Sequence, residues 1–426
     1  MKKDSGKLIY SPSDLVRYVT SPFASWMDRY YLENLGTIVP DQETEEKKLI
    51  AQTGDQHERA ILDEFKASVA KIAEISKADS TIARSETLSA IKAKTPIIYQ
   101  AALESDGFAG FADFLILDAS GHYQIWDTKL ARSPKPYYAI QLCCYSEMFA
   151  ATTGEQMPEK FGIILGSKDK IEFRVEDFIH YYRRVKESFL SMQNSFTGDM
   201  ADRPEPLPPG SDPNRHGRWT SHAERYFDET DHLVRVAGIT IGQIKKLKGA
   251  GVSTMTALAA SSGKSIHKLA SDSLEKLVAQ ARLQCDTRTN RLKDVEAIAS
   301  YEVLPQTGAN GEPVGLAALP PDHPADVFFD MEGYPLISGG LEYLFGTCSV
   351  SKKAGTIEFS DWWGHDRDEE KVAFEGFIDW VFKRWKSNPA MHIYHYAAYE
   401  VNAVRRLSTR HDTRQDEVDD LLRNEV

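Results

Sequence analysis

The pattern of apolar and polar positions in the first 200 residues predicts an α/β unit. Residues 7 to 35 and the stretch "ETEEKKLIAQTGDQHERAILDEFKAS" carry apolar residues at helical spacing. Four shorter apolar or alternating runs predict strands: "TPIIYQAAL", "FADFLILD", "HYQIWDTKLA" and "KFGIILG". A helix over roughly 135–150 precedes the last strand, and the amphipathic "EDFIHYYRRVKESFLSMQNSF" follows it. The predicted order is therefore α-β-β-β-α-β-α.

Two stretches rich in proline and glycine divide the rest of the chain, "DRPEPLPPGSDPNRHG" and "LPQTGANGEPVGLAALPPDHPAD". The sequence between them is helical to about Arg291, and three strands and a helix are predicted after the second. We therefore expect five segments: a domain at 1–200, a linker at 201–230, a helical region at 231–300, a linker at 301–325 and a domain at 326–426.

The net charge of -12 argues against a protein that coats nucleic acid through bulk electrostatics. It remains compatible with an enzyme that binds nucleic acid locally, because hard divalent cations need acidic residues. No apolar run has the length of a membrane span, and the N-terminus lacks the apolar core of a signal peptide. The four cysteines show neither metal-type nor disulfide-type spacing. We expect a cytoplasmic protein with reduced cysteines and no membrane contact.

Two of the predicted strands carry charges that burial alone does not explain, because an unpaired buried charge is costly. If 111–117 and 123–129 form a hairpin about residue 120, Asp113 lies opposite Asp127 and Lys129 shares their face. Two carboxylates on one face suit Mg²⁺ or Mn²⁺, and the lysine could orient or deprotonate an attacking water. The alternative is an Asp–Lys pair on a half-solvated sheet.

"GFADFLILD" and "IWDTKLA" resemble the metal-binding centre of the PD-(D/E)XK nucleases, in their RecB-like branch, with Asp127 and Lys129 as the (D/E)xK motif. The resemblance implies a restriction-endonuclease-like core over residues 1–200. It also implies metal ligation by Asp113, Asp127, the backbone carbonyl of Thr128, and His57 of "GDQHE".

The same branch places a glutamine and a tyrosine on the helix after the lysine, and "AIQLCCYSEM" supplies Gln141 and Tyr145. Their spacing puts both on one helical face, where they could brace the lysine or contact a phosphate. Gln141 and Tyr145 join Lys129 and the two aspartates as the expected catalytic residues. Many relatives hold an iron–sulfur cluster on one N-terminal and three C-terminal cysteines. Because Ser21 stands at the N-terminal position and the C-terminal set is missing, no cluster is expected.

The helical region contains "VAGITIGQIKKLKGAGVSTMTALA", which resembles a helix-hairpin-helix module. Such modules hold nucleic-acid backbone through turn amides and nearby lysines. Lys245, Lys246 and Lys248 are the candidate nucleic-acid-binding residues. The alternative is a purely structural helical hairpin, because lysines often mark only a solvated face.

In the last domain, "DVFFDMEGYP" places Asp330 and Glu332 on one face of a strand. This resembles the first motif of DEDD exonucleases, which have a ribonuclease H-like fold and bind two metal ions. "HIYHYAAYEVNAVRRL" resembles their second motif, with Glu400 as the third carboxylate, as in the YprB-like subgroup. The fourth motif has no convincing candidate, so we expect a partial ribonuclease H-like unit with an incomplete second site.

These resemblances imply a metal-dependent nuclease that hydrolyses DNA, preferentially single-stranded, in repair or recombination. Relatives with this arrangement commonly continue into a superfamily-1 helicase. One alternative is a non-catalytic nucleic-acid-binding scaffold, which the full set of candidate catalytic residues disfavours. Another is a metal-dependent enzyme on small phosphorylated substrates, which the lack of a Gly-rich phosphate loop disfavours.

Overall fold

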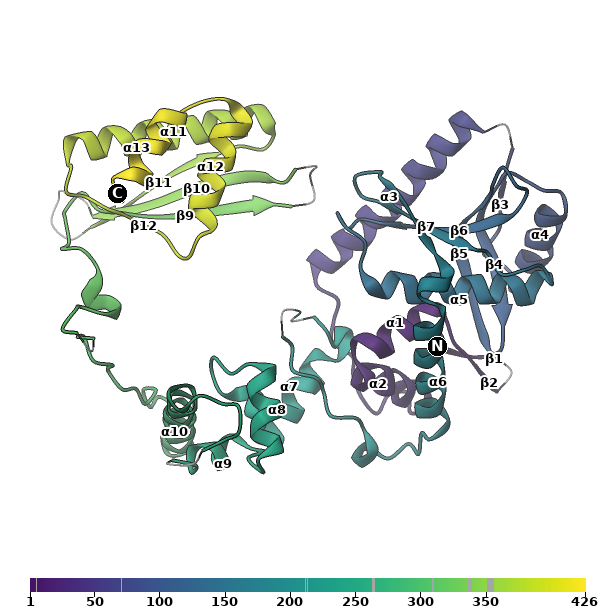
Figure 1. Ribbon diagram of the computed structural model, residues 1–426, viewed down its shortest axis with the longest axis horizontal. Coiled ribbons are helices and arrows are strands. Elements are labelled where there is room, and N and C mark those ends of the chain that lie inside the picture. Colours follow the sequence, from purple (N-terminus) through teal and green to yellow (C-terminus); the bar gives the residue numbers. More distant parts are fainter. Residues whose placement is uncertain are drawn as a thin grey trace. The chain divides into compact units, whose positions relative to one another are not determined.

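The computed structural model describes residues 1–4, 6–69, 71–210, 212, 214–262, 265–308, 310–335, 337, 339–350 and 356–426. The chain divides into two compact units, residues 1–302 and residues 303–426. Each unit contains its own mixture of helices and sheet (Figure 1). Among the helices in these ranges, none combines the length and the apolar character needed to span a bilayer.

A six-stranded sheet of order β3-β4-β5-β6-β7-β8 forms the centre of the first unit. Its strands are β3 (Ile72–Glu74), β4 (Ile97–Ser105), β5 (Phe108–Leu117), β6 (Tyr123–Lys129), β7 (Lys160–Leu165) and β8 (Lys170–Arg174). In the β5–β6 hairpin, Leu115 pairs with Ile125, so the paired residue numbers add up to twice 120 and the expected register is confirmed. The edge strands β3 and β8 were not predicted: β3 has only three residues, and the polar–apolar alternation of β8 extends over only five.

Helices cover both faces of this sheet. They are α1 (Pro12–Thr20), α2 (Pro22–Glu33), α3 (Glu45–Ser68), α4 (Ser80–Lys92), α5 (Pro136–Thr153) and α6 (Ile179–Asn194). Ile61 and Phe65 of α3 pack on Phe114 and Trp126 on one face, while α4, α5 and α6 contribute to the larger core on the other. A short hairpin of β1 (Lys2–Asp4) and β2 (Lys7–Ile9) precedes α1.

The remainder of the first unit is helical: α7 (Thr220–Glu229), α8 (Ile241–Gly249), α9 (Met255–Ala259) and α10 (Ser271–Lys293). Short 3₁₀ turns lie at Val175–Asp177, Met200–Asp202, Gly217–Trp219 and Leu233–Arg235, and one in the second unit at Gly315–Ala318. The stretch 201–230, expected as a linker, includes α7, whose Ala223 and Phe227 are buried with Phe23 and Trp26 of α2.

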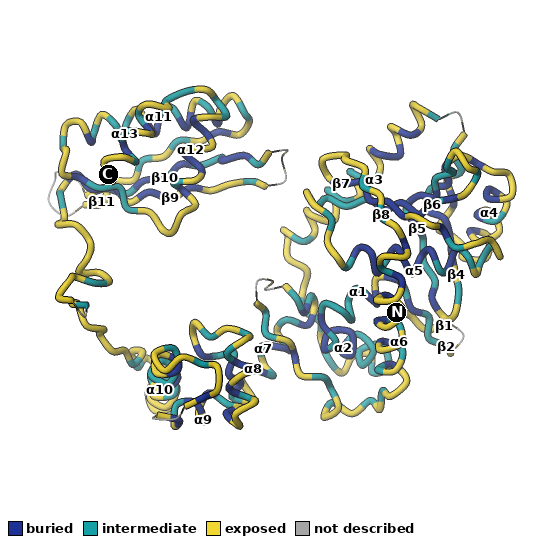
Figure 2. The backbone as a smooth tube through the Cα atoms, in the orientation of Figure 1, coloured by how far each residue is buried: buried dark blue, intermediate teal, exposed yellow. Residues whose placement is uncertain are grey.

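The second unit is a four-stranded sheet of order β11-β10-β9-β12 with three helices. Its elements are β9 (Val327–Tyr334), β10 (Leu341–Val350), β11 (Ile357–Trp363), α11 (Arg367–Ser387), β12 (Ile393–Tyr394), α12 (Tyr399–His411) and α13 (Gln415–Arg423). The helices lie on one side of the sheet (Figure 1). Val327, Phe329 and Met331 of β9 are buried against them, whereas Asp330 and Glu332 are exposed on the opposite face. Figure 2 marks the buried and exposed segments of this unit along the backbone.

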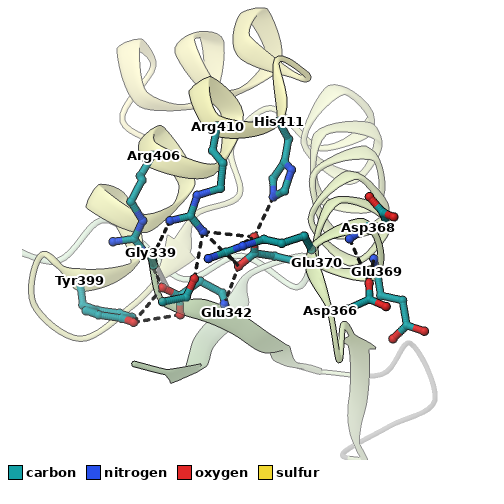
Figure 3. Close-up of polar contacts among 12 residues, drawn as sticks. Gly339, Glu342, Asp366, Asp368, Glu369, Glu370, Tyr399, Arg406, Arg410 and His411 are labelled. Carbon is teal, nitrogen blue, oxygen red and sulfur yellow. Dashed lines mark hydrogen bonds and ion pairs between the residues drawn. The ribbon is translucent and has the colours of Figure 1, made fainter. Parts of the chain in front are cut away.

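A buried carboxylate holds the helices of the second unit to its sheet (Figure 3). Glu370 on α11 accepts hydrogen bonds from the Glu342 amide at 2.6 Å, His411 Nε2 at 2.8 Å, Arg367 at 3.0 Å and Arg410 at 3.2 Å. Burial opposes ionisation of Glu370, but these hydrogen bonds outweigh it and keep its pKa below the ordinary value. The carboxylate is therefore a charged crosslink between α11, α12 and β10.

Glu342 extends this crosslink to the start of α12. Its carboxylate accepts a hydrogen bond from the Tyr399 hydroxyl at 2.9 Å and pairs with Arg406. Tyr399 and Arg406 lie on α12, the helix that also carries Glu400. The position of the predicted third carboxylate thus depends on a hydrogen bond and an ion pair between residues more than 50 positions apart in the sequence.

Replacing Gly162 by alanine should destabilise the first unit. Gly162 on β7 pairs with Trp126, and an added Cβ would lie 2.3 Å from the indole ring. Overpacking of a core costs about 1 to 3 kcal/mol. Urea unfolding followed by tryptophan fluorescence measures the loss. Gly249→Ala is the matched control, because nothing lies within 4 Å of its added Cβ, and a loss of equal size there would contradict the prediction.

Glu370→Gln should destabilise the second unit by roughly 3 kcal/mol at pH 7, because two arginines lose a buried counter-charge. Since folding lowers the pKa of Glu370, its contribution is complete above the unfolded pKa and is lost as the pH falls through the folded one. The difference between wild type and variant should therefore shrink between pH 7 and about pH 3.5. Urea unfolding at both pH values tests this. Asp368→Asn, two residues earlier on α11 and exposed, should change little.

Candidate active site

The first candidate site lies where the central ladder of the sheet is interrupted. The β5–β6 pairing ends at Phe114 and Trp126, and Asp113 and Asp127 are the next residues in the same register. Asp127 is 3% exposed, and Asp113 is half-buried. Instead of a strand-to-strand bond, the backbone N–H and the hydroxyl of Thr128 donate to Asp113 Oδ2 at 2.9 and 3.0 Å. The Asp113 carboxylate therefore replaces a backbone acceptor in the sheet.

Lys129 completes the predicted group on this face. Its ammonium pairs with Asp127 Oδ2 and lies 5.4 Å from the ring centroid of Tyr138 on α5. Burial disfavours the charged form, but Asp127 and Asp113 outweigh that effect and raise the pKa of Lys129. A protonated ammonium has no lone pair to accept a proton. Of the two roles expected for Lys129, this favours orienting water over deprotonating it.

Burial, and then the negative charge of Asp127, raise the pKa of Asp113 above its ordinary value. The Lys129 ammonium and the Thr128 amide act in the opposite direction. Two carboxylates this close and this poorly solvated do not readily ionise together. The site therefore favours a positively charged species beside Asp113.

Gln141 and Tyr145 on α5 contact each other, and Tyr145 also contacts the strand that carries Asp113. The buried Tyr145 hydroxyl donates to the Phe111 carbonyl at 2.8 Å, and a Gln141 hydrogen bond partly offsets the rise in its pKa. Burial, followed by the charges of Asp127 and Asp113, raises that pKa well above the ordinary value. The tyrosine thus braces β5, whereas the sequence suggested bracing of the lysine.

Helix α3 brings His57 and Glu58 to the same region. His57 Nε2 is buried and has no hydrogen-bond partner among the described residues. The Glu58 carboxylate accepts hydrogen bonds from the Tyr99 hydroxyl at 2.8 Å and from the Gln100 amide. Burial, and then the charge of Asp113, raise the pKa of Glu58. The sequence pattern included Glu58 beside His57 but assigned it no role.

Whether these groups suit a divalent cation has two answers. By donor type they fit, since carboxylates with an imidazole are suitable ligands for Mg²⁺ or Mn²⁺, and His57 Nε2 lacks a partner. Asp127 Oδ2 also lacks a hydrogen-bond partner within the described part of the chain, although it pairs with the Lys129 ammonium. By geometry, no three His, Cys, Asp or Glu side chains within the described ranges are close enough together to hold a metal ion. Binding would therefore require side-chain rearrangement.

Ser21, which stands where the RecB-like resemblance would place a cluster cysteine, has a structural role here. It is buried at the N-cap of α2, where its hydroxyl accepts a hydrogen bond from the Ala24 amide at 3.0 Å. The same hydroxyl contacts His216 Nδ1 at 2.8 Å. Ser21 therefore ties α2 to the segment before α7.

The lysines of α8 are largely engaged within the protein. Lys246 donates to the Lys268 carbonyl at 2.6 Å, and Lys248 pairs with Glu205 at 2.6 Å. Lys245 is exposed. A nucleic-acid backbone would have to compete with internal partners for two of the three predicted residues.

In the second unit, Asp330 and Glu332 line a depression of about 600 Å³ on the open face of the sheet. Glu400 is 5% exposed at the start of α12, where its Oε2 lies 3.4 Å from His395 Nδ1. Glu400 lines a different, smaller cavity with Phe329, and His395 borders both cavities. The structure thus brings together two of the three predicted carboxylates.

Comparison with known proteins gives one match to a family model, the RNase_H superfamily, over residues 327–424. No curated protein matches the chain. A solved structure described as "Crystal structure of SSO0001" is 16% identical, with a TM-score of 0.26, and covers 46% of this chain and 80% of that chain. So low a TM-score supports no conclusion about the fold. The match lies within the second unit, which is therefore ribonuclease H-like. Membership of this superfamily suggests a nuclease of the kind that hydrolyses nucleic acids.

Proposed function

We propose that this protein is a metal-dependent nuclease with its catalytic site in the first unit, on a RecB-like PD-(D/E)XK core. The observation that carries the proposal is the charged group of Asp113, Asp127 and Lys129 at the interruption of the central sheet. A surface ion pair would not need a 3%-exposed aspartate or a second carboxylate beside it. The ribonuclease H-like second unit supports a nucleic acid as the substrate.

In this proposal Asp113, Asp127, His57 and the Thr128 carbonyl would hold Mg²⁺ or Mn²⁺. When bound, the cation would polarise the scissile phosphate and acidify a water molecule. The Lys129 ammonium would orient the attacking water and stabilise the negative charge that develops on the phosphate. Gln141 and Tyr145 would keep β5, and with it Asp113, in position.

The substrate we propose is DNA, preferentially single-stranded, and the biological setting is repair or recombination beside a helicase. The acidic net charge is compatible with this, because a cation at the carboxylates would neutralise the site where the phosphate approaches. Asp330, Glu332 and Glu400 of the second unit would contribute an incomplete metal site.

A second candidate function is a non-catalytic scaffold that binds nucleic acid and tethers a helicase. The observation in its favour is that the described residues contain no assembled group of three metal-ligating side chains. The two functions differ in their need for metal. Labelled single- and double-stranded DNA and RNA, incubated with Mg²⁺, Mn²⁺ or EDTA, separate them: cleavage only with the cation supports the nuclease, and metal-independent binding without cleavage supports the scaffold.

Asp113→Asn and Lys129→Ala should each abolish most cleavage while leaving the fold intact. The first removes a charge that attracts the cation, and the second removes charge stabilisation at the phosphate, about 3 kcal/mol or at least a hundredfold in rate. Turnover of labelled DNA, with circular dichroism as the check of folding, measures both effects. Lys160→Ala, which breaks an exposed pair between Lys160 on β7 and Glu172 on β8, is the control and should cleave normally. Normal turnover in Lys129→Ala would leave only the surface-pair interpretation.

Asp330→Ala should leave the cleavage rate of the chain within about twofold of wild type. The Asp330 residue is exposed and Glu400 lines a different cavity, so we expect the metal site of the second unit to be incomplete and to add little to cleavage. The same cleavage assay measures the effect, with Asp113→Asn as the inactive reference. A loss as large as that of the reference would place the chemistry in the second unit instead.

A further inference from the structure

Strand β4 contains a residue in a conformation that strands seldom allow. Gln100 has a φ of +57° and is 5% exposed, although left-handed backbone is costly for residues other than glycine. Its neighbours pair regularly, Tyr99 with Phe114 and Ala101 with Ala112. The position on β5 that faces Gln100 in this register is Asp113. The distortion therefore lies directly beside the candidate active site.

The distortion brings two adjacent side chains to a single carboxylate. In a regular strand, consecutive residues point to opposite faces of the sheet, so Tyr99 and Gln100 should diverge. Instead, both donate hydrogen bonds to Glu58 on α3. The left-handed residue is what allows this convergence. Strain of this kind persists where the surrounding structure maintains it, often at functional sites.

We propose that Tyr99 and Gln100 are positioning residues, which hold the Glu58 carboxylate towards Asp113 as a further ligand for the divalent cation. This inference rests on the proposed nuclease function. Gln100 binds Glu58 and faces Asp113 in the β4–β5 register, so the two carboxylates lie on either side of the same distorted residue. Without a cation, like charges gathered in this way repel one another. Two donors aimed at Glu58 offset that repulsion and fix the carboxylate before the cation arrives.

A purely structural role predicts different behaviour from the same contacts. If Tyr99 and Gln100 only anchor α3 to β4, their removal should lower stability and leave cation affinity unchanged in the protein that remains folded. If they position a ligand, the affinity should fall even where stability does not. Gln100→Gly separates the two, because glycine adopts a φ of +57° without strain while the amide donor is removed.

The test measures Mn²⁺ dissociation constants by electron paramagnetic resonance of free Mn²⁺, and thermal unfolding in EDTA, for the whole chain. Gln100→Gly should unfold at or above the wild-type temperature, yet bind Mn²⁺ about 10- to 100-fold more weakly. Tyr99→Phe should weaken binding in the same direction, and Glu58→Gln should do so by removing the charge itself. Lys94→Gly is the control, since it relieves a φ of +47° at an exposed position and should keep wild-type affinity.

The outcomes distinguish this inference from the proposed function. Wild-type protein that neither binds Mn²⁺ nor cleaves DNA would overturn both. If wild type binds and cleaves while Gln100→Gly and Tyr99→Phe keep their Mn²⁺ affinity within about twofold, the inference fails and the nuclease function stands. Weaker binding that only follows a loss of stability in EDTA would assign Tyr99 and Gln100 a structural role.

Discussion

The hydrogen bond from the Thr128 amide to the Asp113 carboxylate is the contact on which the first candidate site depends. In an ordinary ladder this amide would donate to a backbone carbonyl, and Asp113 would be a liability inside the sheet. Because the carboxylate takes the place of that carbonyl, β5 and β6 stay joined while a charged side chain is held between them. Backbone pairing between β5 and β6 also ends at this point, just before Asp127 and Lys129.

The cost of gathering charges in a poorly solvated sheet is met by specific partners rather than by solvent. Lys129 pairs with Asp127, and Tyr99 and Gln100 bind Glu58. The net effect still favours a positive charge, since the pKa values of Asp113 and Glu58 are both raised. Without a proton or a bound cation, the fully ionised form of this site is therefore disfavoured. This property is expected of a centre that binds a metal ion.

The second unit also contains a buried carboxylate, but this one is stabilised in its ionised form. Glu370 is wholly buried, but four neighbouring groups donate hydrogen bonds to it and its pKa is lowered. This arrangement stabilises an ionised carboxylate and leaves little reason to bind a cation. Asp330 and Glu332, by contrast, lie exposed on the open face. Buried carboxylates in the two units therefore differ in how readily they ionise, because their hydrogen-bond donors differ in number and charge.

Local spacing was sufficient to predict the central strands, the hairpin register and the common face of Asp113, Asp127 and Lys129. These features follow from the two-residue period of a strand and from a short turn. The same holds for Gln141 and Tyr145, one helical turn apart. The PD-(D/E)XK identity of the first unit, in contrast, still rests on motif resemblance.

The contacts of Glu58 with Tyr99 and Gln100, of Lys248 with Glu205, and of Glu370 with His411 join residues about 40 positions apart. No periodicity relates such residues, because only chain folding brings them together. The protonated state of Lys129 and the left-handed Gln100 have the same origin, since both depend on neighbours from other elements. The sequence by itself thus determined which residue types share a strand or helix face. The protonation of the site residues and the backbone conformation of Gln100 were decided by contacts between elements distant in the sequence.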